Sequence, residues 1–347
     1  MEANSMPVLW VTGAPGTGKS TTGWGLFTRI AEQGGSVAYV DIDQLGLIGP
    51  PPGGGGDASH AIKAANVARV LDTLRQRGVR QVIVSGIVDT SRDVALDDLT
   101  LVCLRCDRED LRRRFLGRGS PEALLEELFE LAEQFDRLPN RLDTTGRSPD
   151  DAVTALLPHC VVAPGSVQPL TIPQAPPARV VVVTGATAVG KSTAAWGALN
   201  TLWDKGCKTA YIDTAQFGFV HPGPDPVLAA AAMATMWEGY REAGAETLII
   251  VTRELTPELR GVFGELTTVR LDADAQTLAE RVRRRADGEA PLLAGDELRG
   301  APTAVQLQVA ARAAAEAERR PEADLVLDTK GQTASETAAE LARLIRC

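Results

Sequence analysis

The stretch VLWVTGAPGTGKS at residues 8–20 decides the expected fold. A short apolar run leads into the pattern G-x-x-x-x-G-K-[ST], a loop that cradles phosphates where a strand gives way to a helix. The chain writes the pattern again, because residues 180–183 are all valine and residues 185–192 read GATAVGKS. Two matches in equivalent contexts make chance negligible, so the sequence predicts two nucleoside triphosphate sites.

Each loop supplies the same set of phosphate-binding groups. Its glycines let successive N–H groups turn inward, and its lysine, Lys19 or Lys191, reaches the β- and γ-phosphates. The next residue, Ser20 or Ser192, offers a hydroxyl to Mg²⁺. The residues predicted to bind ATP or GTP are Gly13, Gly16, Thr17, Gly18, Lys19, Ser20, Thr21, Gly185, Val189, Gly190, Lys191, Ser192 and Thr193.

The repeat extends far beyond the loops. Asp41 and Asp213 each follow a Tyr-hydrophobic pair and stand 22 residues after the loop lysine. A glycine-ended helical stretch, a buried strand and the pattern L-x-x-R-x-x-x-R then recur in the same order. Strands that alternate with helices favour a parallel sheet covered on both faces. The expected fold is α/β, with two tandem P-loop NTPase domains, each a parallel sheet flanked by helices and carrying a small helical lid.

Proline and glycine mark the expected boundaries. Six prolines fall between the copies, from Pro158 to Pro177, which predicts an extended linker. We therefore expect one domain at residues 1–158, a linker at 159–177 and a second domain at 178–347. The run from Gly49 to Gly56, rich in glycine and proline, predicts a loop without regular structure.

Composition excludes several classes of function. The 347 residues are 44% hydrophobic and 23% charged, and the net charge of −9 argues against a general nucleic-acid or membrane-surface binder. No apolar run has the length of a membrane span, and the first strand begins too early to leave room for a signal peptide. Five scattered cysteines and three scattered histidines predict neither a disulfide framework nor a histidine metal site, and they fit a reducing cytoplasm.

The order of motifs resembles one superfamily. A P-loop, a strand ending in D-x-D, a strand ending in S-G, L-x-x-R-x-x-x-R and a final D-T resemble the P-loop small-molecule kinases, which include gluconate, adenylylsulfate, shikimate, chloramphenicol and nucleoside monophosphate kinases. Residues 40–44 are similar to the hydrophobic-Asp-Gly-Asp-Asn run of adenylylsulfate and gluconate kinases, with Ile42 in place of the glycine. The resemblance covers most of each half, and it implies phosphoryl transfer from ATP to a small acceptor.

Two carboxylates and two arginines complete the predicted catalytic set. Ligands bind beyond the carboxyl ends of parallel strands, and alternation along a strand places Asp41 and Asp43 on one face. We assign Asp41 to the metal and base role and Asp43 to the acceptor; the simpler alternative is that both merely end a strand. The resemblance implies that Arg114 and Arg118 stabilise the transferring phosphoryl group, although a solvated basic helix face is an alternative. The predicted catalytic residues are Lys19, Asp41, Asp43, Arg114 and Arg118, and the predicted Mg²⁺ ligands are Ser20, Asp41, Ser192 and Asp213.

The two copies differ on the acceptor side. Asp43 aligns with Ala215, and the polar helix residues Lys63, Asn66 and Arg69 align with two alanines and a threonine. The predicted acceptor-binding residues, all in the first copy, are Asp43, Lys63, Asn66, Arg69, Ser85 and Arg92. Drift of a helix surface could produce the same difference without functional meaning.

The sequence thus predicts an ATP-dependent phosphotransferase for a small hydroxyl- or phosphate-bearing metabolite, with transfer mainly in the N-terminal half. The C-terminal half would regulate, form part of a lid or act on another acceptor. A first alternative is a tandem P-loop ATPase or nucleotide-regulated switch, against which neither apolar strand ends in an acidic pair. A second is a polynucleotide kinase-like enzyme, against which the acidic balance and the lack of an aromatic-rich strand platform count.

Overall fold

The computed structural model divides the chain into two compact units. It describes residues 6–50, 56–87, 98–176, 178–289 and 296–345. Unit 1 comprises Met1–Leu45, Lys63–Leu170 and Gly218–Leu228. Unit 2 comprises Gly46–Ile62, Thr171–Phe217 and Ala229–Cys347. Each unit therefore includes one short segment from the opposite half of the sequence.

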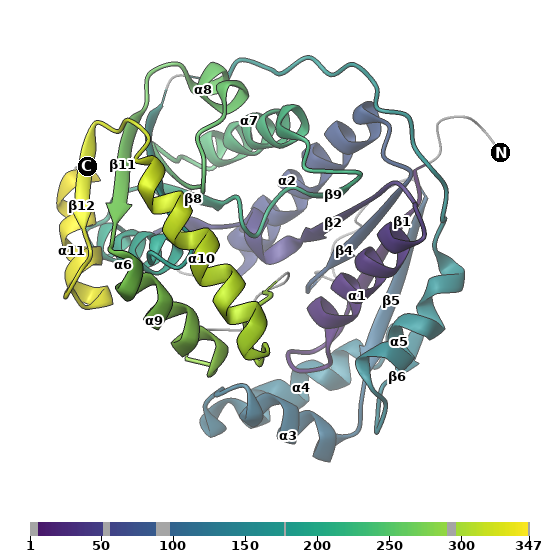
Figure 1. Ribbon diagram of the computed structural model, residues 1–347. Helices are drawn as coiled ribbons and strands as arrows, with labels where there is room; N and C mark the ends of the chain where they lie inside the picture. Colours follow the sequence, from purple (N-terminus) through teal and green to yellow (C-terminus); the bar gives the residue numbers. More distant parts are fainter. Residues whose placement is uncertain (1–5, 51–55, 88–97, 177, 290–295, 346–347) are drawn as a thin grey trace. The chain divides into compact units, whose positions relative to one another are not determined.

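Unit 1 is built on a six-stranded sheet in the order β6-β5-β1-β4-β2-β9. Its strands are β1 (Val8–Thr12), β2 (Val37–Asp41), β4 (Gln81–Ser85), β5 (Leu99–Arg105), β6 (Arg141–Asp143) and β9 (Phe219–His221). Its helical elements are α1 (Lys19–Glu32), η1 (Ile42–Leu45), α3 (Arg108–Gly117), η3 (Glu122–Leu124), α4 (Leu125–Phe135), α5 (Pro149–Leu156) and η4 (Leu157–His159). Helix α2 (Gly56–Arg77) leads into β4. Figure 1 shows α1 and α5 over one face of this sheet.

Unit 2 repeats the arrangement in the order β12-β11-β7-β10-β8-β3. Its strands are β3 (Ile48–Gly49), β7 (Arg179–Gly185), β8 (Thr209–Asp213), β10 (Thr247–Val251), β11 (Thr267–Asp272) and β12 (Leu325–Asp328). Its helices are α6 (Lys191–Asp204), α8 (Pro257–Phe263), α9 (Ala275–Ala286), α10 (Thr303–Arg319) and α11 (Ala334–Ile345), and α7 (Pro226–Glu242) leads into β10. Helices α9 and α10 lie side by side (Figure 1).

Both sheets place the P-loop strand at the point where the strand order reverses. From β1 the chain runs outward to β2, returns to β4 and then crosses β1 to reach β5, and unit 2 follows the same path from β7. These strands pair in parallel and are buried along most of their length. Ligands of open α/β sheets bind at such a reversal, beyond the carboxyl ends of the strands. The predicted α/β fold is confirmed.

The two sheets are mixed because each gains one antiparallel edge strand. In unit 1, Phe219 of β9 pairs with Tyr39 of β2, and in unit 2, Ile48 of β3 pairs with Ala210 of β8. The two edge strands occupy equivalent places in the repeat, because each follows the strand that ends in Asp41 or Asp213. The edge strands are therefore reciprocal, each completing the sheet of the unit built mainly from the other half.

Small residues allow the helix next to each P-loop to pack closely. A Cβ atom on Gly25 of α1 would lie 2.6 Å from Cγ2 of Val153 in α5. The equivalent Gly197 of α6 would bring its Cβ to 2.6 Å from Cβ of Ala338 in α11. Since contacts this short are repulsive, larger residues at these two positions would push the helices apart. The close packing fixes the helix that carries the loop lysine in each unit.

The proline-rich stretch is hydrogen-bonded along its course. Residues 161–176 form no helix or strand, yet the backbone of Ala163 accepts from Ser36 at 2.8 Å, and Gln168 donates to Arg77 at 2.9 Å. Further along, Ala175 donates to the carbonyl of Val262 at 3.2 Å. The stretch therefore packs on both units in turn.

The expectation of a loop over residues 49–56 is wrong at both ends. Gly49 belongs to β3, where a Cβ atom would lie 2.5 Å from the ring of Trp203, and Gly56 begins α2. Residues 51–55 lie outside the described part of the chain. Within the described residues, no helix combines the length and the apolar character needed to cross a membrane.

Candidate functional site

The first P-loop has a backbone that only glycine can adopt at its start. Gly13 has a φ of +136°, and a Cβ there would lie 2.3 Å from the carbonyl oxygen of Leu104 in β5. The loop then turns through a buried Thr17, whose hydroxyl donates to the carbonyl of Ala14 at 2.9 Å. Lys19 opens α1, and its ammonium group donates to the same carbonyl at 2.9 Å. The loop is thus held in the shape that phosphate binding requires.

The second P-loop repeats this geometry. Gly185 has a φ of +137°, and a Cβ there would lie 2.4 Å from the carbonyl oxygen of Leu271 in β11. Lys191 opens α6 and donates to the carbonyls of Gly185 and Ala186, each at 2.8 Å. Val189 is buried beneath the loop. Among the remaining predicted residues, the exposed ones are Ser20, Thr21 and Thr193, and the half-buried ones are Gly16, Gly18, Gly190 and Ser192.

Burial lowers the pKa of both loop lysines to about 8. Around Lys19, the charges of Asp43 and Asp41 act in the opposite direction, and the charge of Arg118 adds to the lowering. These effects place Asp43, Asp41 and Arg118 each within electrostatic range of Lys19. The structure therefore brings four of the five predicted catalytic residues together at the first loop.

Asp41 ends β2 beside the hydroxyl of Ser20. Its Oδ2 accepts from Ser20 Oγ at 3.4 Å, and its Oδ1 accepts from the backbone amide of Asp43 at 3.0 Å. Burial and the nearby charge of Asp43 raise the pKa of Asp41 to about 6. The Ser20 hydroxyl and the Asp41 carboxylate oxygen are close enough to bind one Mg²⁺ ion that also binds phosphates. Burial leaves the charged carboxylate poorly solvated, so a cation at this place would stabilise it.

The expectation that Asp41 and Asp43 share a strand face is wrong. The strand ends at Asp41, and Asp43 lies in the 3₁₀ helix η1. The cause is local, because the Asp41 carboxylate accepts the amide two residues ahead and turns the chain away from the sheet. Asp43 is consequently exposed, and Lys63 of α2 pairs with it at 2.6 Å.

The other predicted acceptor residues lie at different depths. Asn66 is fully buried and donates to the carbonyl of Leu45 at 2.7 Å, which holds η1 in place. Ser85 is fully buried and shares a 2.7 Å hydrogen bond with the hydroxyl of Tyr39. Arg69 lies on α2, and Arg92 falls outside the described residues. Direct contact of these residues with an acceptor stays a prediction.

The two lid arginines have different surroundings. Arg114 donates to the hydroxyl of Thr144 at 3.0 Å and to its carbonyl at 2.8 Å, which ties α3 to the loop after β6. Arg118 ends the same helix, donates to Ser120 at 2.9 Å and lies 5.0 Å from the ring centre of Phe115. The charge of Arg118 also acts on Lys19 and lowers its pKa.

In unit 2 the first of these arginines, Arg281, keeps its contacts and also donates to the carbonyl of Val189 in the second P-loop at 2.7 Å. The charge of the second, Arg285, acts on Lys191 as that of Arg118 acts on Lys19. Arg281 donates to the hydroxyl and the carbonyl of Thr329, each at 2.9 Å, as Arg114 does with Thr144. Arg285 instead pairs with Asp296 at 3.1 Å, whose side chain is only 2% exposed. The guanidinium equivalent to Arg118 is therefore already partnered by a buried carboxylate.

The predicted metal carboxylate of unit 2 also has a different partner. Asp213 is buried, its Oδ1 accepts from the amide of Ala215 at 2.9 Å, and its Oδ2 accepts from the hydroxyl of Tyr211 at 3.3 Å. In unit 1 the equivalent tyrosine bonds Ser85, but unit 2 has Val251 at that position. Loss of one hydroxyl thus redirects the tyrosine onto the carboxylate.

Sequence reasoning missed two groups at these sites. The first is the tyrosine two residues before each aspartate, Tyr39 or Tyr211. The alignment of the two copies could have indicated its change of partner, because Ser85 of the first copy is replaced by Val251 in the second. Glu316 of α10 contacts Thr187 in the second P-loop, with hydrogen bonds of 2.7 Å from the amide and 2.8 Å from the hydroxyl. No signal in the repeat marks Glu316, because the first copy has no carboxylate at that place.

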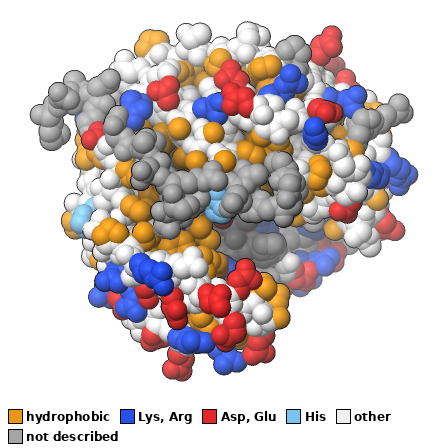
Figure 2. Space-filling model, turned by 180° about the vertical axis from the view of Figure 1, so that it is seen from behind, with side chains coloured by type: hydrophobic (Ala, Val, Ile, Leu, Met, Phe, Trp, Pro, Cys, Tyr) orange, Lys and Arg blue, Asp and Glu red, His pale blue; other side chains and the backbone are white. Residues whose placement is uncertain are grey.

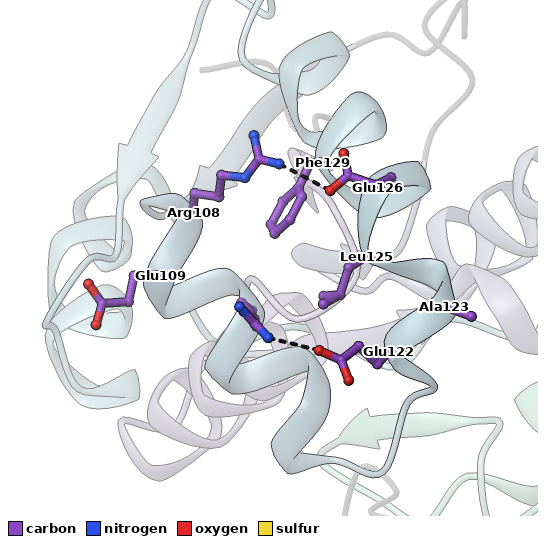
Figure 3. Close-up of a pocket in the computed structure, with 8 residues that line it drawn as sticks. Arg108, Glu109, Glu122, Ala123, Leu125, Glu126 and Phe129 are labelled. Atoms are coloured by element: carbon purple, nitrogen blue, oxygen red, sulfur yellow. Dashed lines mark hydrogen bonds and ion pairs between the residues drawn. The ribbon is translucent and has the colours of Figure 1, made fainter.

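The lid of unit 1 carries an open groove between α3 and α4 (Figure 3). Arg108 lies 3.9 Å above the ring centre of Phe129 and pairs with Glu126 at 3.3 Å. A second pair joins Arg112 to Glu122 at 2.8 Å across the same groove. The groove contains none of the predicted site residues, and its ion pairs join α3 to α4 and to the 3₁₀ helix η3. Figure 2 shows acidic and basic side chains mixed at this end of the molecule.

Comparison with known proteins finds similarity of fold. A family model described as an AAA domain matches residues 9–135, which include the first P-loop, both carboxylates and the lid arginines. No curated protein matches the chain. A solved sugar kinase from Janibacter sp. HTCC2649 is 19% identical, covers 44% of this chain and 94% of its own, and has a TM-score of 0.34.

Two further solved structures are similar over about half of the chain. A gluconokinase from Sinorhizobium meliloti 1021 is 18% identical over 50% of this chain and 95% of its own, with a TM-score of 0.29. The tunicamycin resistance protein of Deinococcus radiodurans is 17% identical over 48% of this chain and 95% of its own, with a TM-score of 0.31. The family match thus shows similarity to an AAA domain over residues 9–135, and the solved structures are similar in fold to about half of the chain.

Proposed function

We propose that the protein is an ATP-dependent phosphotransferase for a small hydroxyl- or phosphate-bearing metabolite, and that unit 1 carries out the transfer. The observation that carries the proposal is the grouping of Lys19, Asp41, Asp43 and Arg118 at the first P-loop. A phosphate-binding lysine, a carboxylate beside a hydroxyl, an exposed carboxylate and a lid arginine are the groups that phosphoryl transfer needs. Unit 2 has the loop but lacks the exposed carboxylate, since Ala215 stands in the place of Asp43.

Each group has a role that follows from its surroundings. Lys19, charged below a pH of about 8, binds the transferring phosphates, and Arg118 stabilises the charge that develops on them. Ser20 and Asp41 would hold Mg²⁺, which supplies further neutralisation of phosphate charge when bound. Asp43 is exposed and oriented by Lys63, so it is placed to receive the hydroxyl of an acceptor.

The contacts of the basic clusters argue against a polynucleotide substrate. On the lid of unit 1, Arg112 pairs with Glu122, while Arg113 and Arg114 share Asp110. Residues 283–285 of unit 2 pair with Asp287, Glu289 and Asp296. Because these charges are locally compensated, they do not form the uncompensated basic surface that binding to a phosphate backbone requires.

A phosphoryl-transfer screen tests the proposal. The full chain with Mg²⁺ and either ATP or GTP is offered nucleoside monophosphates, sugars, sugar acids, amino acids and aminoglycoside-type compounds, and nucleoside diphosphate release is followed. We expect one acceptor class to raise the rate of nucleoside diphosphate release at least about tenfold over the rate without acceptor. A compound that binds equally well in the ground state and the transition state would not raise this rate. Rapid hydrolysis that no acceptor changes would instead support the ATPase or switch alternative.

A further inference from the structure

The second P-loop already contains an anionic side chain. Glu316 of α10 accepts hydrogen bonds from the backbone amide and the hydroxyl of Thr187, at 2.7 and 2.8 Å. Thr187 is the third residue of the loop and stands four residues before Lys191. The Glu316 side chain is only 10% exposed. A loop that binds anions through its N–H groups is thus donating to a carboxylate of its own chain.

The charges around Glu316 are those that a phosphate would use. Arg253 lies 3.8 Å from its Oε1, and Lys191 is close enough to act on its pKa. Burial favours the neutral acid, but the hydrogen bonds from Thr187 and the two cations outweigh it and hold the pKa of Glu316 below the usual value. The carboxylate is therefore ionised at neutral pH, and its negative charge partly compensates the positive charges of Arg253 and Lys191.

Unit 1 lacks both partners of this contact. The residue equivalent to Thr187 is Pro15, which has neither an N–H group nor a hydroxyl. The residue equivalent to Glu316 is Leu131, since each stands 12 residues before the aspartate that ends the last strand. Leu131 packs against the apolar cluster that contains Ala14. Within the described residues, a carboxylate that accepts from the third residue of the P-loop is thus found in unit 2 alone.

We propose that Glu316 is an intramolecular anionic ligand of the second P-loop, which the phosphates of an incoming nucleotide must displace. The inference rests on the proposed binding of nucleotides by these loops. If the site can bind phosphates only when Glu316 has moved away, its apparent Kd equals the intrinsic Kd divided by the fraction of molecules in that open state. Glu316 therefore sets the affinity of the second site and makes its occupation depend on a movement of this side chain.

The test measures nucleotide binding to the second loop alone. In the full chain, Lys19→Ala disables the first loop, and the Kd for ATP·Mg²⁺ is measured by titration calorimetry with and without Glu316→Ala. We expect Glu316→Ala to lower the Kd about tenfold or more, because the internal competitor is removed. Glu318→Ala, which removes an exposed carboxylate two residues along α10, is the matched control and should leave the Kd unchanged.

A second variant addresses the same contact from the loop. Thr187→Pro introduces the residue that unit 1 has and removes both donors to Glu316, so it should also tighten binding. The inference is overturned if Glu316→Ala and Thr187→Pro bind ATP·Mg²⁺ no more tightly than the Lys19→Ala parent. If the chain with both loops intact binds no ATP·Mg²⁺, the proposed function itself has failed. If the Lys19→Ala chain does bind ATP·Mg²⁺ and adding Lys191→Ala abolishes that binding, the second loop is the site measured. An unchanged Kd in the Glu316→Ala variant then contradicts only the role proposed for Glu316.

Discussion

At the scale of single residues, one hydroxyl separates the two carboxylate sites. In unit 1 the hydroxyl of Tyr39 is hydrogen-bonded to Ser85. Asp41 accepts its hydrogen bonds from Ser20 and from the backbone amide of Asp43. In unit 2 the tyrosine bonds Asp213 directly. A carboxylate that already accepts a buried hydroxyl has less capacity for a metal ion, because each bond uses one of its lone pairs. Asp41 and Asp213 each accept one hydroxyl and one backbone amide, but the hydroxyl comes from the P-loop serine in unit 1 and from the buried tyrosine in unit 2.

The two aspartates of unit 1 should respond differently to loss of charge. We expect Asp41→Asn to lower kcat about 100-fold or more, because the group that holds Mg²⁺ and serves as base acts in the transition state. Asp43→Asn should mainly raise the KM for the acceptor, since Asp43 is exposed and paired with Lys63. Steady-state kinetics with varied acceptor separates the two effects. Equal losses of kcat in both variants would contradict the assignment.

At the scale of elements, one ion pair fixes the exchanged edge segment of unit 1. Arg77, the last residue of α2, binds Asp225 through two bonds, Nε to Oδ2 at 2.7 Å and Nη2 to Oδ1 at 3.1 Å. Both side chains are at most 15% exposed. Asp225 also accepts from the amide of Leu228 at 3.0 Å, so it caps the start of α7 as well. This carboxylate thus joins the end of one helix to the beginning of another.

The ion pair makes stability depend on pH. Burial would raise the pKa of Asp225, but the hydrogen bonds from Arg77 and the backbone outweigh it and lower the pKa. A lowered pKa gives stabilisation that is present above the unfolded value of about 3.9 and is lost as the pH falls through the folded value. We expect Asp225→Asn to lower the free energy of unfolding by about 2 kcal/mol at pH 7 and by much less near pH 3.

Urea unfolding at both pH values measures this difference. The control is Asp72→Asn, which alters an exposed carboxylate 3.8 Å from Arg75 on α2 and should change stability by less than about 0.5 kcal/mol. A destabilisation by Asp225→Asn that stays constant between pH 7 and pH 3 would show that the charge of Asp225 is not what holds the segment.

At the scale of the whole molecule, the repeat predicts both sheets because its signals are local. A buried strand before a glycine-rich loop, and an aspartate 22 residues after the loop lysine, place β1, β2, β7 and β8 from neighbouring residues alone. The reciprocal edge strands have no such signal. Strands β3 and β9 are two and three residues long, and their partners lie far along the chain, so tertiary pairing decides them.

The same contrast holds within the sites. Loop glycines and lysines follow from the motif, whereas the turn at Asp43 depends on a side chain that accepts a backbone amide. The contact of Glu316 with Thr187 spans 129 residues, and the described residues of the first half form no equivalent contact. Contacts of this kind arise only when the sheet has brought distant segments together, which is why the pattern of the sequence did not indicate them.

The exchange also determines how the chain is divided. The backbone passes between the units at residues 45–46, 62–63, 170–171, 217–218 and 228–229. A cut within the proline-rich stretch would therefore leave each half without the edge strand of its sheet. Variants in the full chain, not separated halves, are the proper means of assigning activity to a unit.

The most direct measurement compares inactivation of the two loops in the full chain. Lys19→Ala and Lys191→Ala are assayed side by side for phosphoryl transfer to the acceptor found in the screen. The proposal that unit 1 carries out the transfer predicts that Lys19→Ala lowers kcat/KM about 100-fold or more, because the phosphate-binding lysine is lost. Lys191→Ala should retain transfer. Loss of transfer in Lys191→Ala, with Lys19→Ala still active, would contradict the proposal.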